Sequence, residues 1–125
     1  MAAQPRRIVV GFDGTEGARR ALDAAAEMAG YGTSLSVVAV VRDGDRSGKD
    51  VLAAARELLL DRLVTADYVE RTGDPATQIV AVASELAADL VVVGRRDGPE
   101  NLHGEPGSVS AEVVRRASCD VLVVG

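Results

Sequence analysis

Short apolar runs alternate with longer amphipathic segments along this whole chain. Five runs rich in Val, Ile and Leu predict strands, at residues 7–12, 35–41, 67–72, 90–93 and 121–124. Most of these runs are nearly continuous, which is typical of parallel strands that are buried on both faces. The third run alternates apolar and polar residues, so we expect a half-exposed strand there.

The segments between the strands repeat apolar residues at a spacing of three or four, which predicts amphipathic helices. These helices cover residues 17–28, 50–64, 75–86 and 108–117. Gly30 and Gly32 are suited to ending the first helix. Asp74 can cap the third helix, and Pro75 can occupy its first position.

Strict alternation of strands and helices predicts the fold class. We expect an α/β protein with a parallel sheet and helices on both faces, a three-layer α/β/α sandwich that forms one domain over residues 1–125. In such sheets ligands bind outside the carboxyl ends of the strands, where the strand order reverses. The loops at that edge are residues 11–16, 41–49, 72–75 and 94–107.

The composition agrees with this fold and limits the kinds of partner that the protein can bind. Apolar residues make up 47% of the 125 residues but aromatics only 2%, so the core must consist of Val, Leu, Ala and Ile. A net charge of −5, with no basic stripe, argues against nucleic acid as a partner. No apolar stretch reaches the roughly 18 residues needed to span a membrane, and no signal peptide is recognisable, so we expect a cytoplasmic protein without membrane contact. The single cysteine, Cys119, excludes an internal disulfide.

The loop after the fourth strand contains the most informative chemistry. Gly94 ends the strand, and Gly107 with Ser108 stands at the start of the last helix. Glycines let the backbone approach an anion, and the N–H groups of a helix start point at it. Ser108 could therefore hydrogen-bond a phosphate, with the Val109 N–H beside it, or simply cap the helix.

The charges of this loop complicate the phosphate interpretation. Arg95 and Arg96 could neutralise a phosphate or remain solvated, but Asp97 stands where a small neutral residue is expected. A carboxylate about 5 Å from a phosphate charge costs about 3 kcal/mol at an effective dielectric constant of about 20. Residues 94–108 hold two arginines against three acidic residues, a sum of −1. Three arrangements stay open: Gly98 replaces the missing glycine, Asp97 points outward, or Asp97 binds a metal together with the nucleotide.

The chain resembles the universal stress proteins over nearly its whole length. Four segments carry the resemblance, residues 8–15, 73–76, 88–94 and 107–124. The nucleotide motif of that family is Gly, two residues, Gly, nine residues, Gly and then Ser or Thr. Gly94, Gly107 and Ser108 keep this spacing, whereas Asp97 replaces the second glycine.

The resemblance implies a five-stranded parallel sheet of order 3-2-1-4-5 with four helices. It also implies that the chain binds ATP, with Mg²⁺ or Mn²⁺, through Asp13, Val40, Gly94, Arg95, Asp97, Gly107, Ser108, Val109 and Ser110. Asp13 would take a ribose hydroxyl or the metal, although it could equally cap the first helix together with Glu16. Val40 would contact adenine through its backbone, or serve only as strand core.

Two functions follow from the resemblance. The first is a cytoplasmic stress-response regulator that binds ATP as a regulatory ligand. The second is a relative without nucleotide binding that acts as a dimeric interaction module. In both cases the last strand would pair with its copy near Val121–Val124 to make a homodimer. Since the sequence has no nucleophile elbow, metal-ligand spacing or Walker lysine, we expect no enzyme, with slow ATP hydrolysis as a third and weaker alternative.

Overall fold

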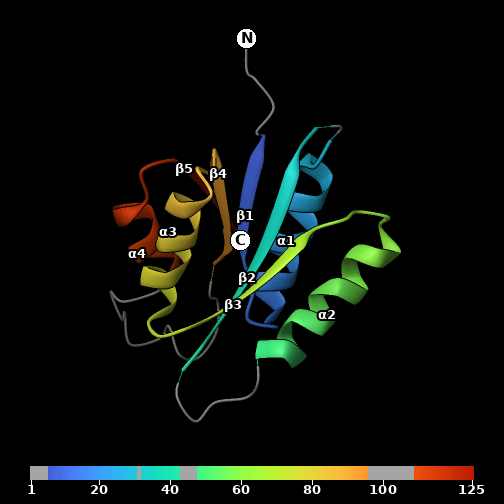
Figure 1. The fold of residues 1–125 in the computed structure, drawn as a ribbon, viewed down its shortest axis with the longest axis horizontal. Coiled ribbons are helices and arrows are strands. Elements are labelled where there is room, and N and C mark those ends of the chain that lie inside the picture. The colour runs from blue at the N-terminus through green and yellow to red at the C-terminus, as the bar shows by residue number, and fades with distance from the viewer. Residues whose placement is uncertain (1–5, 31, 43–47, 96–108) are drawn as a thin grey trace.

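The computed structural model describes residues 6–30, 32–42, 48–95 and 109–125. Strands and helices alternate throughout (Figure 1). They are β1 (Arg7–Gly11), α1 (Glu16–Met28), β2 (Ser34–Val41), α2 (Gly48–Asp61), β3 (Asp67–Thr72), α3 (Pro75–Glu85), β4 (Leu90–Gly94), α4 (Val109–Arg116) and β5 (Asp120–Val124). Every predicted element is present, with bounds that differ from the predicted ones by up to three residues.

The sheet has the predicted topology. Its five strands are parallel and lie in the order β3-β2-β1-β4-β5. Val9 in the central strand β1 pairs with Ser36 on β2 and with Val91 on β4. The chain therefore winds outward from β1 to β3 and then crosses to the other side for β4 and β5. The strand order reverses between β1 and β4.

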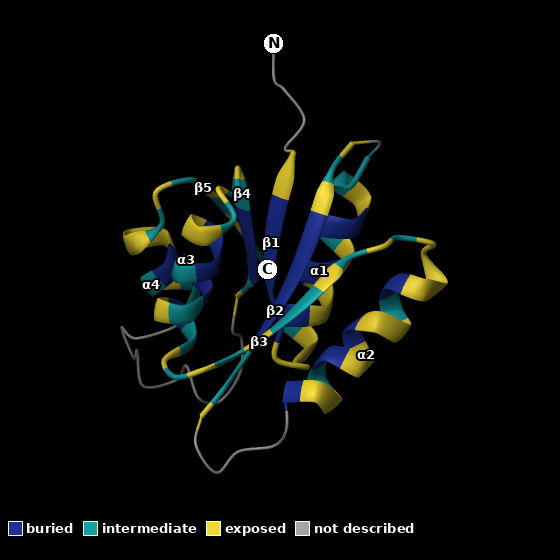
Figure 2. Cartoon of the chain, in the orientation of Figure 1, coloured by how far each residue is buried: buried dark blue, intermediate teal, exposed yellow. Residues whose placement is uncertain are grey.

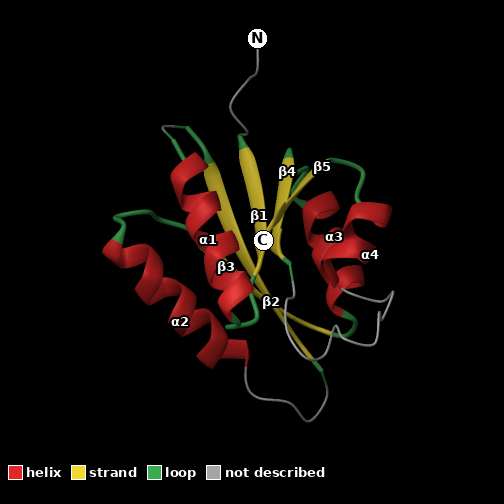
Figure 3. Ribbon diagram, turned by 180° about the vertical axis from the view of Figure 1, so that it is seen from behind, coloured by secondary structure: helices red, strands yellow, loops and turns green. Residues whose placement is uncertain are grey.

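Two helices cover each face of the sheet, which makes the predicted three layers (Figures 1 and 3). Ile8 and Val10 point toward the core under α1 and α2, whereas Val9 points toward the core under α3 and α4. All three side chains are at most 1% exposed. Figure 2 shows the consequence, with buried central strands and helices whose outer faces are exposed. Aliphatic residues in alternate directions along β1 thus hold both outer layers.

Thr15 caps α1, and this corrects the prediction that Asp13 could cap that helix. The Thr15 hydroxyl accepts a hydrogen bond from the Ala18 N–H at 3.3 Å, three residues into the helix. Asp13 lies two residues before the cap, and its Oδ1 accepts bonds from the Thr15 N–H at 3.0 Å and hydroxyl at 2.6 Å. The capping box of Asp13 with Glu16 is therefore wrong, because Thr15 takes the position from which a side chain reaches the first turn.

The ends of α2 and α3 depart from the usual glycine signal. Leu63 and Ala87 adopt φ values of 59° and 52°, in the left-handed region. In each case the next residue closes the helix end, with Val64 N–H donating to Leu59 O at 3.1 Å and Ala88 N–H to Ala83 O at 2.9 Å. These are Schellman closures without glycine. They explain why α2 ends at Asp61 although apolar spacing predicts a helix to residue 64.

The first turn of α1 meets the end of β4 backbone to backbone. A Cβ added to Gly94 would stand 2.8 Å from Ala18 N and closer still to the Gly17 carbonyl. A Cβ added to Gly17 would stand 2.7 Å from the Arg95 carbonyl oxygen. Neither position can hold a side chain without moving the backbone. The two glycines therefore determine how closely α1 approaches the carboxyl edge of the sheet.

Leu59 should contribute far more stability than its neighbour Leu60. Both lie in α2, where Leu59 on the inner face is 1% exposed and Leu60 is 64% exposed. We expect Leu59→Ala to lower the free energy of unfolding by about 2–5 kcal/mol, because it leaves a cavity in the core. Leu60→Ala is the matched control and should change it by less than about 0.5 kcal/mol. Urea unfolding measures both, and equal losses would contradict the burial of Leu59.

Gly94→Ala should destabilise the protein through overpacking. The added methyl group has no space beside Gly17, so α1 and β4 must separate, at a cost of about 1–3 kcal/mol. Gly125→Ala is the control, since its Cβ would meet nothing closer than an Arg95 side-chain nitrogen at 4.0 Å. Urea midpoints of the two variants should differ clearly. Wild-type stability in Gly94→Ala would show that the two backbones are not in contact.

Candidate functional site

A cavity of about 370 Å³ opens at the carboxyl edge of the sheet, where the strand order reverses. This is the edge at which the sequence predicts a ligand. Strand ends, loops and helix starts from both halves of the chain contribute to it. The lining residues are Gly11, Phe12, Asp13, Thr15, Ala18, Val38, Val40, Arg42, Pro75, Ile79, Val93, Gly94, Arg95, Val109 and Ser110.

One part of the cavity is apolar. Val38, Phe12 and Val93 are each at most 3% exposed, and Val40 lies half-buried at the end of β2. Gly11 leaves room for Ile79, because a Cβ there would stand 2.6 Å from the Ile79 Cδ1. An apolar wall of this kind suits a flat, weakly polar group such as a nucleobase.

Three charged residues also line the described part of the cavity, namely Asp13, Arg42 and Arg95. Their formal charges, two positive and one negative, sum to +1. The Asp13 carboxylate is held by its two bonds from Thr15. Arg95 is anchored through its backbone, whose N–H donates to Val124 O at 2.8 Å. This charge balance favours an anionic ligand.

The starts of α3 and α4 also face the cavity, through Pro75 and through Val109 with Ser110. A helix N-terminus carries partial positive charge and attracts anions. Asp74 caps α3, and its Oδ2 accepts bonds from the Thr77 hydroxyl at 2.8 Å and N–H at 3.0 Å. These bonds lower the pKa of Asp74, and the nearby positive charges of Arg116 and Arg42 lower it further. The cap therefore stays ionised at neutral pH.

The structure brings most of the predicted site residues together. The same cavity is lined by Asp13, Val40, Gly94, Arg95, Val109 and Ser110. The remaining three, Asp97, Gly107 and Ser108, lie outside the described residues. Their part in binding stays a prediction, as does the effect of the Asp97 charge.

Sequence reasoning missed several residues of the cavity, Arg42 above all. Arg42 follows directly after β2, and Pro75 follows the short loop after β3. Both positions lie at the carboxyl edge, so their places shortly after strands could have identified them as candidate site residues. Phe12 and Ile79 could not be found in this way, because an apolar residue after a strand or on the inner face of a helix, as Ile79 is in α3, usually belongs to the core.

The described residues suit a metal only together with a ligand. They contain no group of three or more His, Cys, Asp or Glu that could hold a metal ion. Asp13 is the one carboxylate in the described lining. Mg²⁺ is commonly bound by one or two carboxylates together with substrate phosphates, so Asp13 and a nucleotide could hold Mg²⁺ or Mn²⁺ between them. Across the described ranges, no helix has the length and apolar character needed to cross a membrane.

Comparison with known proteins agrees with this fold and identifies the family. The sequence model described as the Universal stress protein family matches residues 5–125. The universal stress protein Rv1636 of Mycobacterium tuberculosis is 34% identical, over 95% of this chain and 95% of that protein. Both matches therefore cover nearly the full length of this chain, including the segments that carry the motifs of the carboxyl edge.

Two solved structures are similar in fold. A universal stress protein in complex with cAMP superposes with a TM-score of 0.77 at 27% identity, covering 98% of this chain and 99% of that one. The universal stress protein from Archaeoglobus fulgidus in complex with dAMP gives a TM-score of 0.77 at 25% identity, covering 98% and 100%. Together with the full-length family match, these likenesses show that the chain belongs to the universal stress protein family.

Proposed function

We propose that this chain binds an adenine nucleotide in the cavity as the regulatory ligand of a cytoplasmic stress response. The observation that carries the proposal is the meeting of an apolar wall, two arginines and two helix starts in one cavity of about 370 Å³. Such a cavity combines a surface for a base with positive charge for phosphate. The cAMP and dAMP complexes of related proteins support the choice of nucleotide.

The lining residues divide into three roles. The adenine lies on the apolar wall near Val40, and Asp13 takes a ribose hydroxyl or a metal bound to phosphate. The phosphate lies at the start of α4, beside Gly94 and Arg95. A charged guanidinium and a helix start add to one another in holding an anion. ATP with Mg²⁺ or Mn²⁺ is the form that the family resemblance implies, and monophosphates are the alternative forms to test.

The nucleotide acts as a regulator and not as a substrate. In the described lining there is no His, Cys or Lys that could serve as nucleophile or general base. The one carboxylate there, Asp13, already accepts two hydrogen bonds from Thr15. Hydrolysis would require activation of a water molecule by a positioned base, which this arrangement does not favour.

We also propose that β5 pairs with its copy in a homodimer. Among the described strands β5 is hydrogen-bonded to β4 alone, so no described strand pairs with its outer edge. Leu122 on β5 is 37% exposed, and Val114 on α4 is 54% exposed. An apolar edge strand requires cover, and a second copy supplies it.

Nucleotide binding can be tested by calorimetric titration with ATP and Mg²⁺, with AMP and with cAMP. We expect at least one of them to bind with a Kd below about 1 mM, which corresponds to about 4 kcal/mol. Arg95→Gln should weaken binding about tenfold or more, because a charged hydrogen bond to phosphate is lost. Arg19→Gln is the control, since Arg19 is an exposed residue of α1 that does not line the cavity.

Absence of heat with all three nucleotides at millimolar concentration would refute nucleotide binding and favour the interaction module. If ATP binds, Asp97→Gly should tighten it, because one negative charge near the phosphates is removed. Unchanged affinity in that variant would show that the carboxylate points away from the ligand.

The dimer can be tested by sedimentation of wild-type and variant chains. Leu122→Asp should shift the dimer toward monomer, because it places a charge in the paired edge. Leu63→Asp is the control, since Leu63 is 94% exposed and lies just beyond the end of α2. A monomeric wild-type chain, or a Leu122→Asp variant that remains dimeric, would count against pairing through β5.

A further inference from the structure

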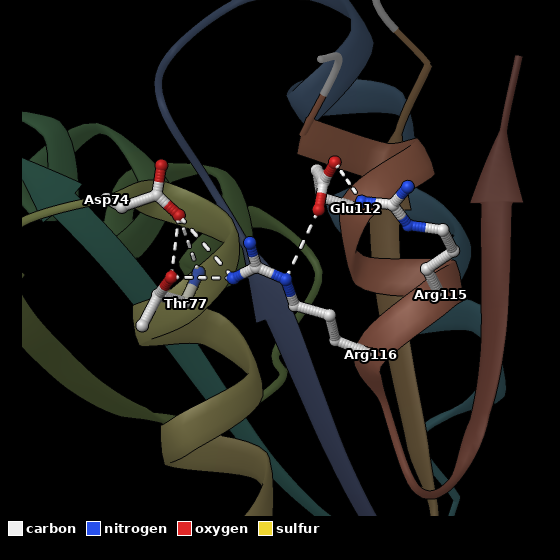
Figure 4. A network of polar contacts seen from close by, with 5 residues as sticks. All are labelled: Asp74, Thr77, Glu112, Arg115 and Arg116. Atoms are coloured by element: carbon white, nitrogen blue, oxygen red, sulfur yellow. Dashed lines mark hydrogen bonds and ion pairs between the residues drawn. The ribbon is translucent and has the colours of Figure 1, made fainter. Parts of the chain in front are cut away.

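Arg116, at the end of α4, connects two helices through one guanidinium group (Figure 4). Its Nη1 donates a hydrogen bond to the Thr77 hydroxyl at 2.7 Å and lies 3.9 Å from the Asp74 Oδ2. Its Nε lies 3.2 Å from the Glu112 Oε2. Asp74 and Thr77 form the start of α3, whereas Glu112 belongs to the first part of α4. Arg116 therefore ties the start of α3 to Glu112, one turn into α4.

The carboxylate of Glu112 depends on its ion pair with Arg116. Its side chain is 20% exposed, and its Oε1 pairs with Arg115. Its Oε2 is buried, and no described donor is aligned for a hydrogen bond to it. The ion pair with Arg116 is therefore what offsets the burial of that oxygen. Removal of Arg116 would leave this buried oxygen without a contact of its own, and the carboxylate would keep only the exposed Arg115 at Oε1, which is unfavourable.

These contacts lie directly behind the cavity wall. Asp74 and Thr77 flank Pro75 at the start of α3, and Pro75 lines the cavity. Glu112 is one turn from Val109, which lines the cavity at the start of α4. Neither Glu112 nor Arg116 is itself part of the lining. The network can thus act on a ligand only through the position of the two helix starts.

We propose that Arg116 is a positioning residue for nucleotide binding. It sets the spacing between the starts of α3 and α4, and so the width of the cavity where the phosphate lies. The proposal rests on the proposed function of the cavity. A guanidinium suits this task because its planar fork directs Nε and Nη1 toward different acceptors, whereas a lysine offers one compact charge.

The affinity test compares Arg116→Gln, Arg116→Lys and the control Arg115→Gln, with cAMP and with ATP and Mg²⁺ as probes. Arg115 contacts Glu112 but has a side chain that is 71% exposed. We expect both Arg116 variants to weaken nucleotide binding by about threefold to thirtyfold, as changes in a coupled network do. Arg115→Gln should bind as the wild type does. Equal affinities in all four proteins would overturn the proposal.

A double variant separates positioning from simple stabilisation. In Arg116→Gln with Glu112→Gln the buried charge is gone, so the urea midpoint should return toward that of the wild type. The bridge to Thr77 is still missing, so nucleotide affinity should stay reduced. Affinity that recovers together with stability would show a merely structural role and would overturn the proposal.

Hydrogen exchange of the ligand-free protein distinguishes failure of this proposal from failure of the proposed function. Arg116→Gln should speed exchange in α4 and at the start of α3, while the amides of β1 keep their wild-type protection. A wild-type chain that binds none of the probes would overturn nucleotide binding, and with it the ligand role of Arg116. Unchanged exchange in α4 would overturn the tie between the helices, whether or not the chain binds nucleotide.

Discussion

Burial of β1 on both faces is the constraint on which the rest of the structure depends. Its side chains alternate between two cores, so each face of the sheet needs its own layer of helices. Parallel strands joined by right-handed crossovers meet this need only when the chain winds in both directions from the centre. The reversal between β1 and β4 follows directly, and the cavity opens at that reversal. The place of the site is thus a consequence of how the core is buried.

The same winding explains the character of the cavity. Every helix that follows a strand begins at the carboxyl edge, so α3 and α4 both direct their starts toward it. Positive charge there comes from backbone dipoles as well as from Arg42 and Arg95. Close approach of α1 through Gly17 and Gly94 shapes the wall beside β4. The resemblance assigns Gly94 to the nucleotide motif, and the structure shows that it is also required for packing.

Local chemistry predicted most of the elements because their signals are local. Apolar runs located the strands, and Asp74 with Pro75 marked the start of α3 correctly. Leu63 and Ala87 carry no glycine or proline signal, and α2 ends three residues before its predicted end, whereas α3 ends within one residue of its predicted end. The left-handed conformations of these two residues are held by closing hydrogen bonds to Leu59 and Ala83, both buried in the core. Packing of the helix, and not residue type, decided where each one stops.

By itself, the sequence determined the alternation of elements, the family and six of the residues around the cavity, because these depend on order and spacing along the chain. Only the tertiary structure decided which side chains meet across it. Arg42 lines the cavity from the loop after β2, and Arg116 bonds Thr77 across 39 positions of sequence. The contact of Arg116 with Thr77 arises because α3 and α4 pack side by side on one face of the sheet. The geometry of contacts across the fold is set by the packed layers, so it cannot be predicted from residue spacing within a single segment.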